Sequence, residues 1–414
     1  MWFDRSGTAR ASARLGLLTL LLCAWPSRLG AEPERTAQLA AVRPGDPLPG
    51  LAPSELERFQ RGREAFETAH TPATGLGPIF NDSACNRCHN RRGVGGAGIQ
   101  SAMLAGLSEH GRFDPLTAFG GPAFASASIT LEVEGRRLAP RCALPPDGEP
   151  VPARANVVAR RRTTPLFGLG LVDATPDAVF RDLAAGQAPA IRGRAARVIA
   201  LGTGVSAVGK LGWKAQAPSL HQFAGLALSQ EMGITNPEFP AETLPLGAAS
   251  WLALCDLVPE LEEDEGGVQH LVDFLQGLAP IPALPLGPEA RRGDELFRAL
   301  GCDGCHTRRL RSGPSPIPAL SEQTYAPYSD FLLHDMGGLG DGVAEGDAGP
   351  REMRTAPLWG GHLYGGSRLL HDGRAKSYEA AILAHDGQGA AARAAFAALA
   401  AADRTALIAF LAAL

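Results

Sequence analysis

The sequence predicts a mainly α-helical protein with two related domains, long loops and minor β structure. Three observations lead to this fold class. A short segment with helical spacing recurs as Arg61–Phe66 and Arg292–Phe297, which indicates a repeated unit. Apolar residues recur at helical spacing in several other segments. The 414 residues also include 50 Gly and 33 Pro, which predict many turns and long irregular connections.

Residues 1–31 have the pattern of a secretory signal peptide. Three arginines precede a short apolar core over residues 15–25, which is too short to cross a bilayer. Cys23 lacks the small preceding residues expected at a lipidation site. We therefore expect an exported protein without a stable membrane span. The formal net charge of −4 gives no reason to expect binding to nucleic acid.

The predicted organisation after the signal peptide is a linker and two domains. The linker covers residues 32–54, the first domain 55–280 and the second domain 281–414. Each domain contains one Cys-x-x-Cys-His pentad. The length of the first domain implies a large insertion relative to a minimal unit built around one pentad.

The two pentads predict covalently attached haem c. In this motif two thiols bond to the haem vinyl groups, and the adjacent histidine ligates the iron. A zinc site or a redox-active Cys-x-x-Cys pair is the less favoured interpretation. The sequence thus predicts two cytochrome c-like haem domains. The predicted attachment residues are Cys85, Cys88, Cys302 and Cys305, and the predicted iron ligands are His89 and His306.

Regular elements are predicted between and after the pentads. Ile129, Leu131 and Val133 alternate with polar residues before a turn at 134–136, which predicts a β-hairpin. Helices are predicted from Thr175-Pro176 to about Ala185, and over Ser219–Glu231, Val268–Leu278 and Arg404–Leu414.

Several motifs of this chain resemble those of the bacterial dihaem oxidoreductases. The family comprises peroxidase-like and thiol oxidoreductase-like proteins, distantly similar to dihaem cytochrome c peroxidases and MauG-type enzymes. The resemblance covers most of residues 55–414 and is looser over 100–160. It implies a dihaem fold and redox chemistry. Besides the pentads, the motifs are Thr163–Asp177, Leu211–Gly225, Glu231–Pro240, Tyr328–Gly342, Met353–Gly360 and Leu369–Gly387.

The sixth iron ligands are not given by the pentads. A methionine would favour electron transfer, whereas an open position would admit an oxidant. Met336 is the first candidate for the second haem because its motif is the stronger match to the family, and Met353 is the alternative. Met232 is a candidate ligand or pocket wall at the first haem.

The first haem is the predicted reaction centre. The resemblance to dihaem peroxidases makes His110, 21 residues after His89, a candidate distal ligand or acid/base. An exposed loop histidine is the more ordinary interpretation. Glu109 is a candidate proton donor. The resemblance to dihaem peroxidases implies that Trp213 passes electrons between the haems. The alternative interpretation is an aromatic residue of the core.

Two further features have open interpretations. The acidic loop Gly340–Gly349 is a candidate Ca²⁺ site, with a solvated loop as the alternative. Cys142 and Cys255 are candidates for a disulfide, with a buried free thiol at Cys255 as the alternative.

The expected function is that of a periplasmic dihaem oxidoreductase of the peroxidase type. The second haem would transfer electrons to the first, which would bind the oxidant. The expected partners are a periplasmic electron donor or acceptor and hydrogen peroxide. The alternatives are a non-catalytic dihaem electron carrier and a haem-bearing module of a larger secreted complex.

Overall fold

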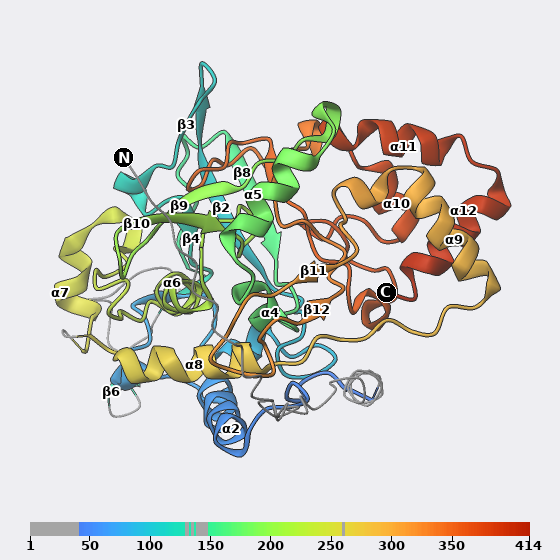
Figure 1. Ribbon diagram of the computed structural model, residues 1–414. Helices are drawn as coiled ribbons and strands as arrows, with labels where there is room; N and C mark the ends of the chain where they lie inside the picture. The colour runs from blue at the N-terminus through green and yellow to red at the C-terminus, as the bar shows by residue number, and fades with distance from the viewer. Residues whose placement is uncertain (1–40, 129–131, 134–135, 138–147, 259–260) are drawn as a thin grey trace, which may run out of the picture.

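The computed structural model describes residues 41–128, 132–133, 136–137, 148–258 and 261–414. It contains 36% helix and 16% strand, so helix predominates but strands contribute more than the sequence predicts. Helices α9 to α12 gather on one side of the molecule, and helices α2, α6 and α8 lie on the other (Figure 1). The predicted signal peptide, 1–31, lies outside the described residues.

The α-helices occur in two groups along the chain. Those before residue 280 are α2 Pro53–Glu67, α3 Cys85–Cys88, α4 Leu169–Asp173, α5 Asp177–Gly186, α6 Leu220–Met232, α7 Leu252–Cys255 and α8 Glu265–Gly277. Those after it are α9 Pro288–Ala299, α10 Tyr378–Leu383, α11 Ala390–Ala397 and α12 Ala401–Leu411.

The strands are short and form small antiparallel sheets. The largest sheet has the order β3-β2-β4, with β8 also paired to β2. The strands before residue 150 are β1 Ile79–Phe80, β2 Ser101–Glu109, β3 Arg112–Asp114, β4 Ala123–Phe124, β5 Ala127–Ser128, β6 Glu132–Val133 and β7 Arg136–Arg137. The later strands are β8 Val157–Arg162, β9 Ala196–Ala200, β10 Val205–Gly209, β11 Leu310–Arg311, β12 Thr324–Tyr325, β13 Leu333–Asp335 and β14 Glu352–Arg354.

Two helix pairs correspond to the repeat seen in the sequence. Helix α2 packs on α8, and α9 packs on α12. Both contacts depend on glycine: a Cβ atom at Gly62 would lie 2.1 Å from the carbonyl oxygen of His270, and one at Gly293 would lie 1.9 Å from that of Ala406. The absence of a side chain at Gly62 and Gly293 therefore lets each pair of helix backbones approach closely.

Matching aromatic contacts stabilise the two helix pairs. The ring centres of Phe66 and Phe274 are 4.7 Å apart in the first pair, and those of Phe297 and Phe410 are 5.3 Å apart in the second. Such pairs add about 0.5–1.5 kcal/mol beyond the burial of their surface. The repeated segments of the sequence thus form the same packing unit twice.

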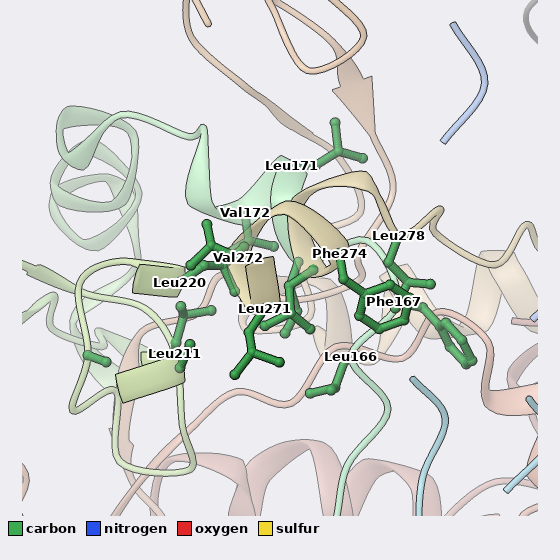
Figure 2. Packing of buried hydrophobic residues seen from close by; sticks show 14 of the residues in the cluster. Leu166, Phe167, Leu171, Val172, Leu211, Leu220, Leu271, Val272, Phe274 and Leu278 are labelled. Carbon is green, nitrogen blue, oxygen red and sulfur yellow. The ribbon is translucent and has the colours of Figure 1, made fainter. Parts of the chain in front are cut away.

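Helix α8 runs through the larger hydrophobic core. Val268, Leu271, Val272 and Leu275 are buried on one face of it, as the spacing in the sequence predicts. Figure 2 shows Leu271, Val272 and Phe274 of this helix with side chains from the 166–172 segment and with Leu211 and Leu220. A smaller core forms between α9, α11 and α12.

Core packing does not follow the predicted division at residue 280. Leu320, Tyr325 and Phe331 come from the second half of the sequence but belong to the larger core. Trp359 packs there as well. The chain after α9 therefore contributes to both cores, and the two-domain division stays a prediction.

Most of the predicted elements are present with small shifts. Helices α5, α6, α8 and α12 match the four predicted helices within a few residues. Ser219 caps α6 by accepting a hydrogen bond from the Gln222 amide, as serine commonly does. Strands β6 and β7 pair as the predicted hairpin, although Ile129 and Leu131 lie outside the described residues.

Strand β8 was missed because buried arginine interrupts its apolar pattern. Ala159 and Arg161 face inward, and Arg160 between them is exposed. Arg161 is buried because it pairs with Asp341 and Glu345, about 180 residues further along the chain. Buried and exposed residues alternate along β8, but apolar and polar residues do not. The sequence pattern therefore could not predict this strand.

Candidate functional site

Both pentads open into one large cavity. Its volume is about 760 Å³, and its walls are largely apolar. Cys85, Cys88 and His89 lie on one part of the wall, and Cys302–His306 contributes to another. Cofactor and ligand cavities commonly measure about 300–1,000 Å³. The structure therefore places the two chemically distinctive motifs at one site.

The first pentad holds its histidine in a defined orientation. Its cysteines form the one-turn helix α3, and His89 follows directly. The Nδ1 atom of His89 lies 3.0 Å from the carbonyl oxygen of Thr164 and 3.2 Å from that of Gly96. Carbonyl oxygens only accept, so Nδ1 carries the proton and Nε2 keeps a free lone pair. Phe66 packs beside this ring, with centres 6.2 Å apart.

The second pentad repeats the same arrangement. Residues Cys302–Gly304 form a 3₁₀ turn, and the Nδ1 atom of His306 donates to the carbonyl oxygen of Tyr328 at 3.0 Å. Phe297 packs beside the imidazole with ring centres 6.4 Å apart, as Phe66 does at the first site. Both histidines therefore present Nε2 as a metal ligand, oriented by a hydrogen bond at the other nitrogen.

Burial sets the protonation of both motifs. It lowers the pKa of His89 and of His306 to about 4, so both imidazoles are neutral at pH 7 and able to bind a metal. Burial also raises the pKa of Cys85 to about 12 and that of Cys302 to about 11. A redox-active Cys-x-x-Cys pair needs a lowered thiol pKa, so the geometry disfavours thiol chemistry.

The residues present fit a haem group at each pentad. Each site offers two unpaired cysteines, a neutral imidazole and apolar walls. These are the donors and surroundings of an iron tetrapyrrole attached through cysteine. The two sites define the class of a haem-binding redox protein.

A second histidine faces His306 across the cavity. The ring centres of His306 and His385 are 6.4 Å apart, with an angle of 59° between the planes. Two imidazoles that share one metal ion have ring centres roughly 6 Å apart, because each metal–nitrogen bond is about 2 Å and each nitrogen lies about 1 Å from its ring centre. The Nδ1 atom of His385 donates to the carbonyl oxygen of Ala381 at 2.8 Å, which leaves its Nε2 atom free.

His385 is a candidate sixth ligand that sequence reasoning missed. In the sequence it forms a His-Asp pair with Asp386, for which structural hydrogen bonding is the ordinary interpretation, and it stands 79 residues after His306. Only the packing of α10 beside the second pentad brings the two rings together. Its position within a motif of the resemblance, Leu369–Gly387, was the one available signal.

The predicted methionine ligands all line the cavity. Met336 lies near His385, since both approach Gly389. Met353 is buried on β14, opposite His334 of β13. Met232 is buried at the end of α6. The Met336 prediction therefore stays open, but the facing rings make His385 the better-supported ligand at the second site.

Glu109 and His110 lie away from the cavity. They form the tip of the β2–β3 hairpin, which projects from the molecule (Figure 1). Both side chains are exposed, and neither lines the cavity. His110 adopts a φ of 51°, which suits a tight turn. The structure does not bring these two candidates together with His89, so it gives no support for a role at the first haem.

Trp213 lies on the cavity wall. Its indole Nε1 donates to the carbonyl oxygen of Arg162 at 3.1 Å, and its own carbonyl accepts from the Arg354 amide at 2.9 Å. Its ring also contacts His371 edge-on, with centres 6.3 Å apart.

These bonds belong to a continuous connection between the two proximal histidines. Arg162 lies two residues before Thr164, which binds His89. Thr355 follows Arg354, and its carbonyl accepts from the Ser329 hydroxyl at 2.7 Å. In order, the connection passes through His89, Thr164, Arg162, Trp213, Arg354, Thr355, Ser329, Tyr328 and His306.

Glu231 is a further candidate that sequence reasoning did not identify. It lines the cavity at the end of α6 and accepts a hydrogen bond from the Asn81 amide at 2.7 Å. Burial raises its pKa, and its charge contributes to the raised pKa of Cys88. A carboxyl group with a raised pKa beside the first pentad is suited to proton transfer.

The acidic loop 340–349 is occupied by side-chain cations of the protein. Asp347 pairs with Arg194, and Asp341 pairs with Arg161 and Lys214. The ammonium group of fully buried Lys214 lies 2.9 Å from Asp341, 3.1 Å from the carbonyl oxygen of Gly349 and 2.6 Å from that of Glu352. These are oxygen donors of the type that Ca²⁺ uses, but Lys214 takes the cation's position.

Cys255 is disulfide-bonded, which removes the interpretation as a free thiol. Its predicted partner, Cys142, lies outside the described residues. In the described part of the chain, no helix combines the length and apolarity needed to cross a membrane.

The family comparison agrees with the class that the site defines. Residues 154–414 match the family described as "Di-haem oxidoreductase, putative peroxidase". Because this match covers more than half of the sequence, the chain belongs to the di-haem oxidoreductase family. No curated protein matches it.

Two solved structures show distant similarity. Hydrazine synthase from Kuenenia stuttgartiensis is 13% identical, with a TM-score of 0.40, and the match covers 99% of this chain and 100% of the other. A MauG-like protein associated with microbial copper homeostasis is 14% identical, with a TM-score of 0.38 and coverage of 90% and 92%. With TM-scores below 0.5, neither likeness carries an argument about fold or function.

Proposed function

We propose that this protein is an exported dihaem oxidoreductase of the peroxidase type, with haem c attached covalently at both pentads. The family, the paired Cys-x-x-Cys-His motifs and the shared cavity support the proposal. When bound, the haem irons supply one-electron transfer and, at an open coordination position, binding of an oxidant.

The observation that carries the proposal is the difference between the two proximal histidines. His306 has His385 facing it at 6.4 Å. Among the described residues, the only ring contact of His89 is with Phe66. Two imidazole ligands saturate an iron and favour electron storage, whereas a single one leaves a position for an oxidant. We therefore assign electron storage to the second site and reaction with the oxidant to the first.

The side chains of the cavity have separate parts in this function. His89 and His306 would hold the metals through Nε2. Trp213 joins the two sites through its hydrogen bonds to the backbone, which supports its predicted part in electron transfer. Glu231 replaces Glu109 as the proposed proton donor because it lines the cavity and burial raises its pKa.

The proposed partners follow from the same reaction. Hydrogen peroxide is the proposed oxidant, and a periplasmic electron donor or acceptor is the proposed redox partner. The predicted signal peptide supports export to the periplasm. The pairing of Arg and Lys with the acidic loop gives no support for a Ca²⁺ cofactor.

Optical and EPR spectra of the purified, full-length protein test the proposal. We expect one low-spin haem, one high-spin haem and a spectral change at the high-spin site on adding peroxide. Two low-spin haems that are both inert to peroxide would contradict it and would favour a pure electron carrier.

Mass spectrometry of pentad variants tests the covalent attachment. Replacing Cys85 and Cys88 with Ala should remove the mass of one haem and leave the second. The matched double replacement of Cys302 and Cys305 should remove the other. Retention of two haems by either variant would refute the assignment.

A further inference from the structure

Three arginines gather beside the first pentad. Arg162 lies at the end of β8 and lines the cavity two residues before Thr164. The charges of Arg91 and Arg368 act on Arg162, so the three guanidinium groups are close neighbours. Arg91 also lies over the ring of Tyr364, 5.9 Å from its centre.

This cluster has no anionic partner among the described residues. The Nε atoms of Arg162 and Arg368 are buried without a hydrogen-bond partner there. The neighbouring Arg161, by contrast, pairs with Asp341 and Glu345. Tyr364 does not supply a negative charge, because burial raises the pKa of its hydroxyl.

A buried cluster of positive charges without an anion is energetically unfavourable. Burial, reinforced by Arg368 and Arg91, lowers the pKa of Arg162 to about 10. Buried charges are ordinarily paired, since an unpaired one loses its hydration without a substitute. An anion in the cavity would supply the missing partner, and planar guanidinium groups match carboxylates through paired hydrogen bonds.

We propose that Arg162, with Arg368 and Arg91, binds the propionate carboxylates of the haem attached at Cys85 and Cys88. This inference rests on the proposed function. The propionates of a porphyrin lie on the edge opposite its vinyl groups. The cysteines would fix the vinyl edge at α3, so the carboxylates would need a cation from another part of the wall. Arg162 at the end of β8 lies on that wall, and the charge of Arg368 acts beside it.

The test is the pH dependence of the first haem's midpoint potential in the full-length holoprotein. In the native protein, the arginines keep the propionates ionised, so the potential should be nearly constant across neutral pH. Arg162→Gln should lower the potential, because a positive charge near the iron is lost. It should also raise a propionate pKa, so that the potential falls as pH rises through neutrality.

Two variants provide the controls. Arg160→Gln removes an exposed arginine from the same strand and should leave the potential and its pH dependence unchanged. Arg162→Lys keeps the charge and should restore part of the native behaviour. If Arg162→Gln does not fold, Arg368→Gln should show the same changes to a smaller extent.

The outcomes separate this inference from the proposed function. Absence of haem at the first pentad of the native protein would overturn both. If haem is present but Arg162→Gln has the native potential at every pH, the arginines do not bind the propionates, although the proposed function still holds. Arg368→Gln decides in the same way if Arg162→Gln does not fold. A native potential that shifts on titration with acetate or chloride would mean that the arginines bind a free anion, which would also overturn it.

Discussion

The two pentad sites share one frame and differ in what faces their histidines. In each, a helix pair meets at a glycine, a phenylalanine packs beside the histidine, and Nδ1 donates to a backbone carbonyl. Among the described residues, only His306 has a second imidazole opposite it. The first site instead adjoins Glu231 and the arginine cluster.

This comparison shows that attachment and reactivity have different structural origins. The attachment geometry arises from local sequence, a helix followed by the pentad, and therefore occurs twice. The difference in reactivity between the two sites arises from side chains that are distant from the pentads in sequence, such as His385 at the second site and Glu231 at the first. A repeated unit can thus acquire two roles without a change in its own motif.

The largest expected effect is loss of the sixth ligand at the second site. His385→Ala should convert that iron from low-spin to high-spin, because it removes the ring facing His306. EPR of the oxidised protein measures the change. Met336→Ala is the matched control and should leave the low-spin signal intact. Loss of that signal only in Met336→Ala would return the assignment to methionine.

The next largest effect concerns the proton donor at the first site. Glu231→Gln should slow the reaction with peroxide by about 10²–10⁴-fold, the usual contribution of a general acid or base. Because the pKa of Glu231 is raised, the native carboxyl keeps its proton at pH values where a free glutamate is ionised. The native rate should therefore fall as pH rises through the raised pKa, and Glu231→Gln should lack that dependence.

Glu109→Gln is the control for this experiment. Glu109 is exposed on the β2–β3 hairpin, so its replacement should leave the rate unchanged. A large loss in Glu109→Gln and none in Glu231→Gln would restore the proton donor predicted from the sequence. Stopped-flow absorbance at the high-spin band gives both rates.

The sequence could predict what depends on local spacing. The pentads, the repeated Gly and Phe positions and helices α5, α6, α8 and α12 all have a signal within about 20 residues. It could not predict the partners of Arg161 or His306, because those contacts join segments far apart in the chain. Glu109 was chosen because it stands beside His110, the candidate ligand 21 residues after His89. The β2–β3 hairpin holds both residues away from the cavity.

The acidic loop shows the same limit. Its carboxylates resemble a Ca²⁺ site in sequence, but the compensating charge comes from Lys214 and Arg161, more than 120 residues earlier. Composition of a loop therefore cannot decide between a metal ion and a side-chain cation. That decision depends on which side chains the fold brings to it.

An intermediate effect is expected when this internal cation is removed. Lys214→Met should destabilise the protein by about 3–5 kcal/mol, because it leaves buried Asp341 with one cation fewer. Exposed Lys376→Met should have little effect. Denaturant unfolding measures both, and addition of Ca²⁺ or a chelator should not change the native value. A chelator that destabilises the native protein would contradict the assignment of Lys214 as the cation.

The pH dependence of unfolding gives an independent check on Lys214. Burial opposes ionisation of Asp341, but Arg161 and Lys214 lower its pKa below the ordinary value of 3.8. Its ion pairs therefore stabilise the protein above that value, and the contribution is lost as pH falls through the lowered pKa. Without Lys214 the pKa rises, so Lys214→Met should lose stability at a higher pH than the native protein.

The smallest effect directly compares the two helix pairs. Gly62→Ala and Gly293→Ala each add a Cβ atom within about 2 Å of a facing carbonyl oxygen, so each should destabilise its own pair by about 1–3 kcal/mol. We expect Gly62→Ala to broaden the high-spin spectrum and Gly293→Ala the low-spin spectrum. Gly287→Ala, where a Cβ atom meets nothing within 4 Å, is the control. If both substitutions disturbed the same haem, the sites would not be supported by separate helix pairs.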